Sequence, residues 1–259
     1  MTKDFQHIKF RIDDRVARIT FARPPLNVFN IEMMREIGEA LNACLPQREL
    51  AAIVFDAAAD TRAFSAGVAV EEHVPKTVFQ MLDSFHSVFR LLAQISRPVV
   101  AVVDGPALGG GCELVAACDI VIASERARFG QPEIKLGVFP PVAAILLPRV
   151  IGEKRARELI MLGDMIDAAE ALRLGLVNYV VAETELEPKL LSVLTKLRDL
   201  SASSLAMTRA ALELGGHTNF QSALDRVENL YLHELMKTED AQEGVRSFME
   251  KRKPEWRHK

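Results

Sequence analysis

A run of three glycines and the glutamate that follows it are the residues in this sequence best suited to do chemistry. Gly109, Gly110 and Gly111 connect an apolar, strand-like segment to a helix, and Glu113 lies in the first turn of that helix. The amide N–H groups at a helix start have no partner within the helix and lie at the positive end of its dipole. This turn can therefore hold a negatively charged oxygen against the main chain, close to a carboxylate.

A second segment of small and apolar residues is Ala63–Ala69, which also follows an apolar strand-like segment. If the N–H of Val68 faces the N–H of Gly110, the two amides form an oxyanion hole that stabilises charge developing on a carbonyl oxygen. Ser65 resembles the nucleophile of a serine elbow, but Ala63 replaces the first glycine of that motif, and no Asp and His follow in a recognisable pattern. We therefore expect main-chain donors rather than a serine nucleophile.

A second carboxylate, Glu133, lies in a loop after the next predicted strand. Taken singly, each glutamate has an ordinary explanation, because a carboxylate favours a helix start and one beside proline is usually solvated. If neighbouring parallel strands bring Glu113 and Glu133 to the same amides, they form a paired-carboxylate site for general acid and base catalysis. Because adjacent carboxylates titrate as a pair, the sequence leaves open which is the acid and which the base.

Two nucleotide-binding interpretations of the glycine run fail. A phosphate-binding loop needs Gly-Lys-Ser or Gly-Lys-Thr, whereas Cys112 and Glu113 follow Gly111, and the dinucleotide fingerprint needs a glycine where Leu114 stands. The six histidines are scattered, and the three cysteines lack the paired spacing of a zinc site. We therefore expect the glycines to serve something other than a pyrophosphate turn, and we expect no metal.

The composition is that of a globular chain. Its 259 residues are 49% hydrophobic and 26% charged, which suits one large α/β domain or a domain with an appendage. The formal net charge of −3 gives no basic excess with which to bind nucleic acid or an anionic membrane surface. Three widely spaced cysteines, and the lack of any apolar run near the ~20 residues of a membrane span, favour a cytoplasmic protein.

The elements that must position these groups follow a repeated order of strands and helices. Alternating apolar residues predict an antiparallel hairpin over residues 8–21, and the three-to-four spacing behind an Asn30 cap predicts a helix over 31–45. Further strands are predicted at 51–55, 99–103, 119–123 and 176–181. Because helical segments separate these strands, we expect a right-handed β-α-β spiral.

The last third of the chain shows only helical periodicity. One apolar stripe in it is formed by Leu224, Val227, Leu230, Tyr231 and Leu235. No low-complexity linker precedes this region, so we expect it to pack on the core or on a neighbouring subunit. We therefore divide the chain into a core of residues 1–184 and a helical region of residues 185–259.

Three motifs resemble the enoyl-CoA hydratase/isomerase (crotonase) family, namely Phe64–Gly67, Ala107–Leu114 and Ala127–Ile134. The resemblance covers essentially the whole chain, and the tail Glu243–Pro254 is similar to the hydratase C-terminus. It implies an α/β fold in which a crotonase-like β-β-α spiral forms the catalytic core that binds acyl-CoA. A C-terminal helical trimerisation region follows this core. It also implies acyl-CoA thioester substrates and assembly as a homotrimer, or as a hexamer of two trimers.

The same resemblance implies roles for individual residues. The N–H groups of Val68 and Gly110 hold the thioester oxygen, and Glu113 and Glu133 handle water and the substrate proton. Coenzyme A enters as part of the substrate, so no separate cofactor is implied. Contacts to the coenzyme A moiety are implied for Arg23, Ala66, Val68, Ala69, Val70, Phe248 and Lys251. A solvated helix end is the alternative interpretation of the charge run that contains Lys251, but we favour contact with a coenzyme A phosphate because the flanking Phe248 is suited to cover an adenine.

The residues themselves fit hydration. An α,β-unsaturated thioester becomes electrophilic at its β-carbon when its carbonyl oxygen is stabilised, and each amide donor contributes ~3 kcal/mol at the transition state. We expect Glu113 to orient and activate water and Glu133 to deliver the proton to carbon, with roles that the pair can share. Because some isomerases of the family lack one acid, the presence of both favours hydration.

The sequence departs from the common hydratase pattern around the acyl group. Ala69 stands where the family usually has Asp, and Pro140–Ala144 replaces a glycine-rich stretch. Together with Arg23–Val28, these residues resemble the cyclohexa-1,5-diene-1-carbonyl-CoA hydratases, although ordinary sequence drift explains them equally well. An enoyl-CoA isomerase, or a non-catalytic acyl-CoA-binding protein, is the alternative function. The sequence does not decide the acyl group, the physiological direction, or trimer against hexamer.

Overall fold

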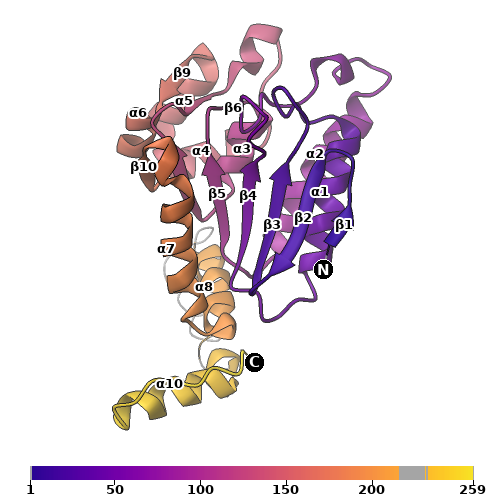
Figure 1. The fold of residues 1–259 in the computed structure, drawn as a ribbon. Helices are drawn as coiled ribbons and strands as arrows, with labels where there is room; N and C mark the ends of the chain where they lie inside the picture. The colour runs from indigo at the N-terminus through magenta and orange to yellow at the C-terminus, as the bar shows by residue number, and fades with distance from the viewer. Residues whose placement is uncertain (1, 216–230, 232, 259) are drawn as a thin grey trace.

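A seven-stranded sheet forms the centre of the computed structural model, which describes residues 2–215, 231 and 233–258. In sheet order the strands are β1 (Thr2–Asp4), β2 (Ile8–Asp13), β3 (Val16–Phe21), β4 (Ala52–Ala57), β5 (Val99–Val103), β7 (Ile120–Ser124) and β10 (Tyr179–Val181) (Figure 1). The first three pair antiparallel, and every pair from β3 to β10 is parallel. The predicted hairpin and the parallel spiral are therefore confirmed.

The hairpin closes through a two-residue turn. Asp14 and Arg15 have φ angles of 43° and 61°, the left-handed conformation that the tight turns of β-hairpins require. Asp and Asn tolerate this conformation better than most residues, so Asp14 is a suitable first turn residue. The alternation of Ile8, Phe10 and Ile12 then places the apolar side chains of β2 on one face.

A second, three-stranded sheet was not predicted from the sequence. It consists of β6 (Pro106–Leu108), β8 (Arg128–Gly130) and β9 (Met165–Asp167), with β6 and β8 parallel. Each strand is three residues long, which is too short to show an alternating pattern. This sheet matters for the site, because β6 leads into the glycine run and β8 leads to Glu133, and the two strands pair at Ala107 and Phe129.

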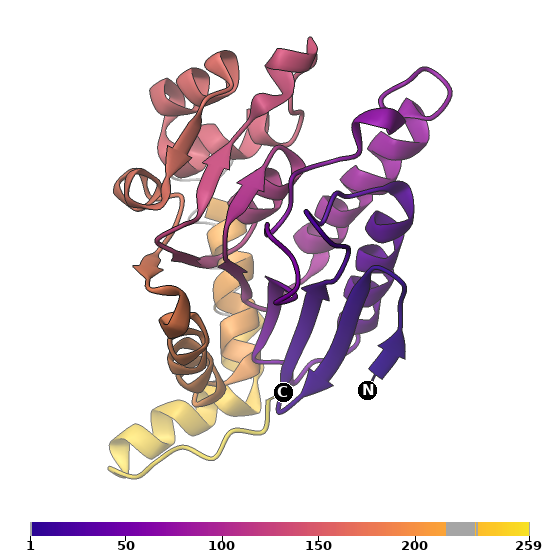
Figure 2. The same ribbon diagram turned by 45° about the horizontal axis from the view of Figure 1, so that its top comes forward.

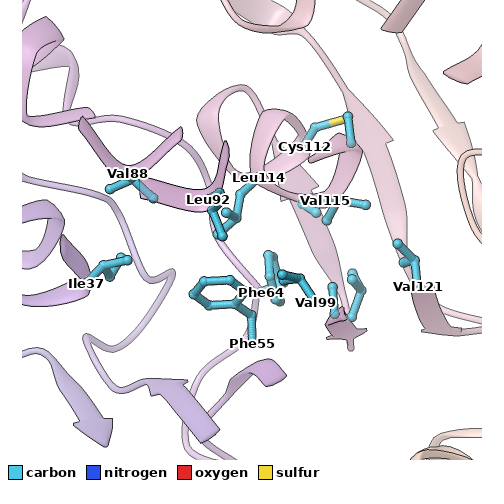
Figure 3. Packing of buried hydrophobic residues seen from close by; sticks show 14 of the residues in the cluster. Ile37, Phe55, Phe64, Val88, Leu92, Val99, Cys112, Leu114, Val115 and Val121 are labelled. Carbon is cyan, nitrogen blue, oxygen red and sulfur yellow. The ribbon is translucent and has the colours of Figure 1, made fainter. Parts of the chain in front are cut away.

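Helices cover both faces of the large sheet (Figures 1 and 2). On one face lie α1 (Ile31–Cys44), α2 (Val78–Gln94) and α3 (Gly110–Ala116), and on the other lies α7 (Leu186–Arg198). The predicted cap of α1 is confirmed, since Asn30 Oδ1 accepts the N–H of Met33 at 3.0 Å. The larger core fills the space between the sheet and the first three helices (Figure 3). That view shows Phe55 of β4, Phe64, and Leu114 and Val115 of α3 as members of this core.

The C-terminal part is helical, as predicted, and packs on the core. It contains α7, α8 (Ala202–Gly215) and α10 (Glu239–Met249), while the predicted stripe from Leu224 to Leu230 lies outside the described residues. The guanidinium of Arg209, on α8, bonds Asp119 Oδ2 at 2.9 Å and the carbonyl of Ile95 at 2.6 Å. These contacts tie α8 to the loops at the start of β5 and β7.

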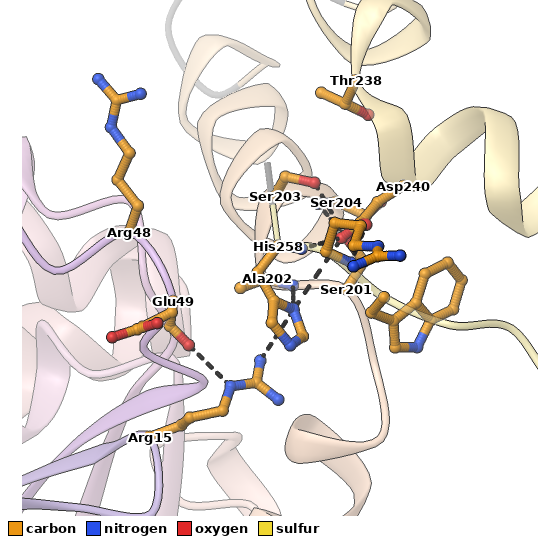
Figure 4. Close-up of polar contacts among 12 residues, drawn as sticks. Arg15, Arg48, Glu49, Ser201, Ala202, Ser203, Ser204, Thr238, Asp240 and His258 are labelled. Carbon is orange, nitrogen blue, oxygen red and sulfur yellow. Dashed lines mark hydrogen bonds and ion pairs between the residues drawn. The ribbon is translucent and has the colours of Figure 1, made fainter.

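A polar cluster joins α10 and the C-terminal tail to the start of α8 (Figure 4). Asp240 is almost completely buried, and its carboxylate accepts the Ser201 hydroxyl at 2.6 Å. It also accepts the main-chain N–H groups of Arg257 at 2.6 Å and His258 at 2.9 Å. Three donors thus satisfy this carboxylate, and we refer to these four residues as the Asp240 cluster.

Three further helices lie between β8 and β10 in the chain, two before β9 and one after it. They are α4 (Ala143–Ile151), α5 (Glu153–Leu162) and α6 (Ala168–Leu174), and the 3₁₀ helix η2 (Pro132–Leu136) precedes them. Glu133 therefore lies in a helical turn rather than in the irregular loop expected from the sequence. Within the described part of the chain, no helix has the length and apolar character needed to span a membrane.

Candidate active site

The glycine run folds into a turn that only glycine fits. Gly109 has φ of 52°, and its N–H donates to the carbonyl of Gly130 at 2.9 Å, which anchors the turn to β8. A Cβ added at Gly109 would lie 2.6 Å from Glu133 Oε1, so the carboxylate approaches the bare backbone directly. A Cβ at Gly110 would lie 2.8 Å from the Phe85 ring and 2.9 Å from Val68 Cγ2. Val68 and Gly110 are therefore neighbours, as predicted.

The N–H groups of Val68 and Gly110 are available to a ligand. The neighbouring amides are already used, because the N–H of Ala69 donates to Phe29 O at 2.9 Å and that of Gly109 to Gly130 O. Within the described residues, neither the N–H of Val68 nor the N–H of Gly110 donates a hydrogen bond to a protein acceptor. Unpaired donors beside a cavity form the arrangement needed to stabilise an oxyanion.

The two carboxylates meet at the same cavity, although they come from α3 and η2. Glu113 is 2% exposed, and its Oε1 accepts the N–H of Ala143, at the start of α4, at 2.7 Å. Burial raises the pKa of Glu113 to about 8, with repulsion from Glu133 adding to the shift and the N–H groups of Ala143 and Val142 opposing it. Burial also raises the pKa of Glu133 to about 7. Near neutral pH the pair therefore holds a proton that ordinary glutamates would have lost.

Gln131 is a site residue that the sequence analysis did not single out. It is fully buried, and with its amide nitrogen turned toward the carboxylate it donates to Glu133 Oε1 and Oε2 at 3.3 and 3.1 Å. This contact restrains the position of the Glu133 carboxylate. Its place two residues before Glu133 was the available signal, but a glutamine in a loop has no chemical pattern that separates it from a solvated residue.

The cavity beside these groups has a volume of about 400 Å³. Its polar end is formed by Val68, Gly109, Glu113 and Glu133. The rest of the wall is mostly apolar and is contributed by the 3₁₀ helix η1 (Val70–Glu72) and the residue after it, by α2, and by η2 and the segment after it. These lining residues are Val70, His73, Val78, Met81, Leu82, Phe85, Leu136, Val138, Phe139, Pro140 and Pro141. The cavity can thus hold an apolar group whose carbonyl oxygen lies at the polar end.

His73 was also missed in the sequence analysis. It follows the 3₁₀ helix η1 (Val70–Glu72), and its Nδ1 lies 2.9 Å from the carbonyl oxygen of Ala69. Because a carbonyl only accepts hydrogen bonds, Nδ1 carries the proton in this contact. His73 is the one titratable side chain on this wall besides the two glutamates, among the residues that the structure describes.

The residues expected to contact coenzyme A fall into three groups: those at the cavity, Arg23, and two C-terminal residues. Ala66, Val68 and Val70 line the cavity, and Ala69 is buried directly between Val68 and Val70. Arg23 lies outside the cavity wall, with its Nη1 bonded to the carbonyl of Val28 at 3.1 Å.

The two C-terminal residues of that set are not brought to the cavity within one chain. Lys251 is exposed and follows α10, which lies beyond one end of the large sheet, whereas α3 lies toward the other end (Figure 1). Phe248 belongs to α10, but its side chain is outside the described structure. Among the described residues, no group of three or more His, Cys, Asp and Glu side chains is placed to hold a metal ion.

Comparison with known proteins identifies the family. The sequence model of the enoyl-CoA hydratase/isomerase family matches residues 11–259. The chain belongs to this family. It is 38% identical to the cyclohexa-1,5-dienecarbonyl-CoA hydratase of Thauera aromatica, with 95% of each chain covered. It is 40% identical to a probable enoyl-CoA hydratase of Rhizobium meliloti, again with 95% of each chain covered.

Solved structures of this family confirm the crotonase fold. An enoyl-CoA hydratase of Mycobacterium smegmatis superposes with a TM-score of 0.91 at 30% identity, covering 97% of this chain and 99% of that one. A second, from Geobacillus kaustophilus, superposes with a TM-score of 0.94 at 25% identity, with 100% and 99% covered. The enoyl-CoA hydratase/isomerase assignment made from the three sequence motifs is therefore correct.

Proposed function

We propose that this protein adds water reversibly across the double bond of an enoyl-CoA thioester. The observation that carries the proposal is that two unpaired main-chain donors and two carboxylates with raised pKa values lie at one largely apolar cavity. The donors are the N–H groups of Val68 and Gly110, and the carboxylates are Glu113 and Glu133. No other part of the described chain combines these features.

The first task of the site is to polarise the thioester. With its carbonyl oxygen between the two N–H groups, negative charge that develops as water attacks the β-carbon is stabilised in place. Val68 and Gly110 are held by the surrounding backbone before the substrate arrives, so little reorganisation is needed during the reaction. The apolar wall of the cavity lowers the local dielectric and strengthens both hydrogen bonds.

The second task is to move two protons. One glutamate takes a proton from water as its oxygen bonds to the β-carbon, and the other gives a proton to the α-carbon as the enolate collapses. The raised pKa values of Glu113 and Glu133 favour a pair that holds one proton and so contains one acid and one base. We assign water activation to Glu113 and proton delivery to Glu133, and proton exchange between the neighbours restores the starting state.

A hydration assay tests this function. Incubation with crotonyl-CoA and with cyclohexa-1,5-diene-1-carbonyl-CoA should abolish the conjugated-thioester absorbance of at least one of them. Mass spectrometry should show a gain of about 18 daltons, the mass of water, and Glu133→Gln should suppress both signals. Failure of the wild-type protein to hydrate any enoyl thioester contradicts the proposal.

The acyl group that we propose is cyclic. The support is the 38% identity to a cyclohexa-1,5-dienecarbonyl-CoA hydratase, together with a cavity wall stiffened by Pro140 and Pro141. A rigid, largely apolar cavity favours a compact ring over a flexible chain. We expect a higher kcat/KM for the cyclic dienoyl thioester than for linear enoyl thioesters of similar size, and equal values would contradict this choice.

Double-bond isomerisation is the alternative chemistry at the same site. An isomerase moves a proton between carbons and needs one acid, so the pair of carboxylates favours hydration. Reaction in ¹⁸O-water separates the two, because hydration incorporates the label and isomerisation does not. Binding of CoA thioesters without any turnover would instead indicate a non-catalytic acyl-CoA-binding protein.

We also propose assembly as a homotrimer or as a hexamer of two trimers. The support is indirect, since Lys251 is expected to contact coenzyme A but lies away from the cavity of its own chain. A neighbouring copy could place it there. Light scattering on the purified protein measures the assembly directly, and a monomer that hydrates its substrate at full rate would contradict this arrangement.

A further inference from the structure

The oxyanion donor at Val68 lies on a loop that is hydrogen-bonded to another segment of the chain, residues 25–29. We propose that two buried side chains, Asn27 and Ser65, are positioning residues for this donor. The inference rests on the proposed function, because it concerns the oxyanion hole of that site. Neither side chain lines the cavity, so any effect on the reaction must pass through the main chain that carries the donors.

The backbone contacts come first. Segment 25–29 runs beside the oxyanion loop, residues 62–69, and four main-chain hydrogen bonds of 2.7 to 2.9 Å join them. In one of these, the N–H of Phe29 donates to the carbonyl of Gly67 at 2.8 Å. In the next, the N–H of Ala69 donates to the carbonyl of Phe29 at 2.9 Å. Phe29 thus holds the loop on both sides of Val68.

The contact at Gly67 sets the direction of the catalytic donor. The carbonyl of Gly67 and the N–H of Val68 belong to one planar peptide unit, in which a trans bond makes them point in opposite directions. Because Phe29 holds the carbonyl, the N–H of Val68 must point to the other side of the loop. Gly110 lies beside this peptide unit, since a Cβ built at Gly67 would lie 3.4 Å from the nitrogen of Gly110.

Asn27 fixes the segment that provides Phe29. Its side chain is completely buried, with Nδ2 donating to the carbonyl of Ala63 at 2.9 Å and Oδ1 accepting the N–H of Arg23 at 2.9 Å. Its backbone has φ of 49°, a left-handed conformation that Asn adopts more readily than most residues. The amide therefore joins both segments at the point where the chain turns toward Phe29.

Ser65 closes the network on the loop itself. Its hydroxyl donates to the main-chain carbonyl of Asn27 at 2.8 Å and accepts the N–H of Gly67 at 3.1 Å. The hydroxyl is thus committed at both ends and fully buried, which explains why Ser65 is not a nucleophile. A continuous path of hydrogen bonds runs from the Asn27 side chain, through Ser65, to the peptide that precedes Val68.

Removal of either side chain should loosen the donor without removing it. A donor displaced by a fraction of an ångström still binds the ground-state carbonyl but stabilises the developing charge less well. We therefore expect kcat to fall by roughly 10- to 100-fold, with KM changed less than about threefold, when either contact is lost. A purely structural role would instead lower the amount of folded protein and leave the kcat of the folded fraction unchanged.

The test uses Asn27→Gly and Ser65→Ala in the full-length protein. Glycine keeps the positive φ of position 27 available, so the variant removes the amide without adding backbone strain. The matched control is Asn30→Ala, which removes the cap of α1 in the same part of the chain, where the described side-chain hydrogen bonds of Asn30 go to Met33 and Glu32 and not to the oxyanion loop. Ser65→Cys serves as the conservative variant, because a thiol of similar shape is a weaker donor and acceptor.

The readout is the carbonyl stretching frequency of bound ¹³C-labelled butyryl-CoA, a saturated thioester that cannot be hydrated. We expect wild type and Asn30→Ala to lower this frequency equally on binding, Asn27→Gly and Ser65→Ala to lower it less, and Ser65→Cys to be intermediate. The kcat values should follow the same order. Wild-type frequency shifts and kcat values within twofold of wild type in both variants would overturn the proposal, as would a loss of kcat with an unchanged shift.

If Asn27→Gly does not fold, the comparison of Ser65→Ala with Ser65→Cys decides by the same criteria. Failure of the proposed function is separable, because it would show as absent turnover of every enoyl thioester by the wild-type protein. The infrared shift of a bound saturated thioester needs no turnover and reports on the two main-chain donors, Val68 and Gly110, that bind its carbonyl oxygen.

Discussion

Glu113 and Asp240 are two buried carboxylates with almost the same exposure, 2% and 1%, in contrasting surroundings. Asp240 receives three hydrogen bonds, from Ser201, Arg257 and His258, and has a purely structural setting. Glu113 receives main-chain N–H groups at the start of α4 and faces a second carboxylate, Glu133, across an open cavity. Burial alone therefore does not distinguish a reactive carboxylate from a structural one. The distinguishing features of Glu113 are that it has fewer hydrogen-bond donors and lies beside a second carboxylate.

Surface carboxylates complete the contrast. Asp104 bonds the Arg126 guanidinium at 2.6 Å, and this cation holds the pKa of Asp104 below its usual range. Among the described residues Glu113 has no cation in this role, and its burial raises its pKa to about 8. The same functional group is thus kept ionised at one position and kept protonated at another by its partners.

The largest expected effect comes from the reactive carboxylates. Glu133→Gln keeps the size of the side chain but removes its acid and base function, so we expect kcat for enoyl-CoA hydration to fall by about 10² to 10⁴-fold. The ultraviolet absorbance of the conjugated thioester measures this. Glu113→Gln should cost a similar factor, and a variant of either residue within tenfold of wild type would remove it from the catalytic pair.

The next effect concerns the unpaired main-chain donors of the site, whereas those of the Asp240 cluster are bonded to its carboxylate. Gly110→Ala adds a Cβ that would lie 2.8 Å from the Phe85 ring and 2.9 Å from Val68 Cγ2, which must displace the donors. We expect kcat to fall by roughly 10² to 10³-fold, as for the loss of one oxyanion donor. Circular dichroism serves as the control for folding, and unchanged kcat would show that the Gly110 N–H does not contact the oxyanion.

Stability should depend on pH in a direction set by the site. In the folded protein Glu113 has a pKa of about 8 against an ordinary value of 4.5, so between these values the folded state holds a proton that the unfolded state has lost. Raising the pH across this window should therefore lower the free energy of unfolding, by up to about 1.4 kcal/mol per pH unit for one proton.

Denaturant unfolding of wild type and Glu113→Gln from pH 5 to 8.5, a range of about 3.5 units, measures this dependence. The variant cannot titrate at this position, so its curve should be flatter than that of wild type. Parallel curves would contradict the raised pKa. Asp104 should behave oppositely, since its lowered pKa provides stability that is lost as the pH falls to acidic values.

The smallest effect on catalysis is expected in the Asp240 cluster. Asp240→Asn removes a charge that three donors satisfy, so we expect a loss of about 1 to 3 kcal/mol in the free energy of unfolding. The kcat of the folded protein should stay within twofold of wild type. A large fall in kcat at wild-type stability would show that this cluster contributes to the reaction and would break the contrast with Glu113.

Much of the fold could be predicted from local patterns. The alternation in β2 and β3, the Asn30 cap and the continuous apolar strands report directly on burial, because each periodicity matches one element. The small sheet could not be predicted in this way, since β6, β8 and β9 are three residues long and pair only because distant segments meet. The described C-terminal helices were predicted as helices, but their packing partners were not.

The amino-acid sequence by itself determined which chemical groups exist: the bare amides around Gly110, the glutamates at 113 and 133, and three motifs specific enough to indicate the family. Only the tertiary structure decided which of them meet and how they ionise. Proximity across about 20 residues, and the burial that raises a pKa, depend on what the rest of the chain packs around them. For the same reason, the roles of Gln131, Asn27 and Ser65 could not be predicted from their residue types, because they depend on hydrogen bonds that form only in the folded chain.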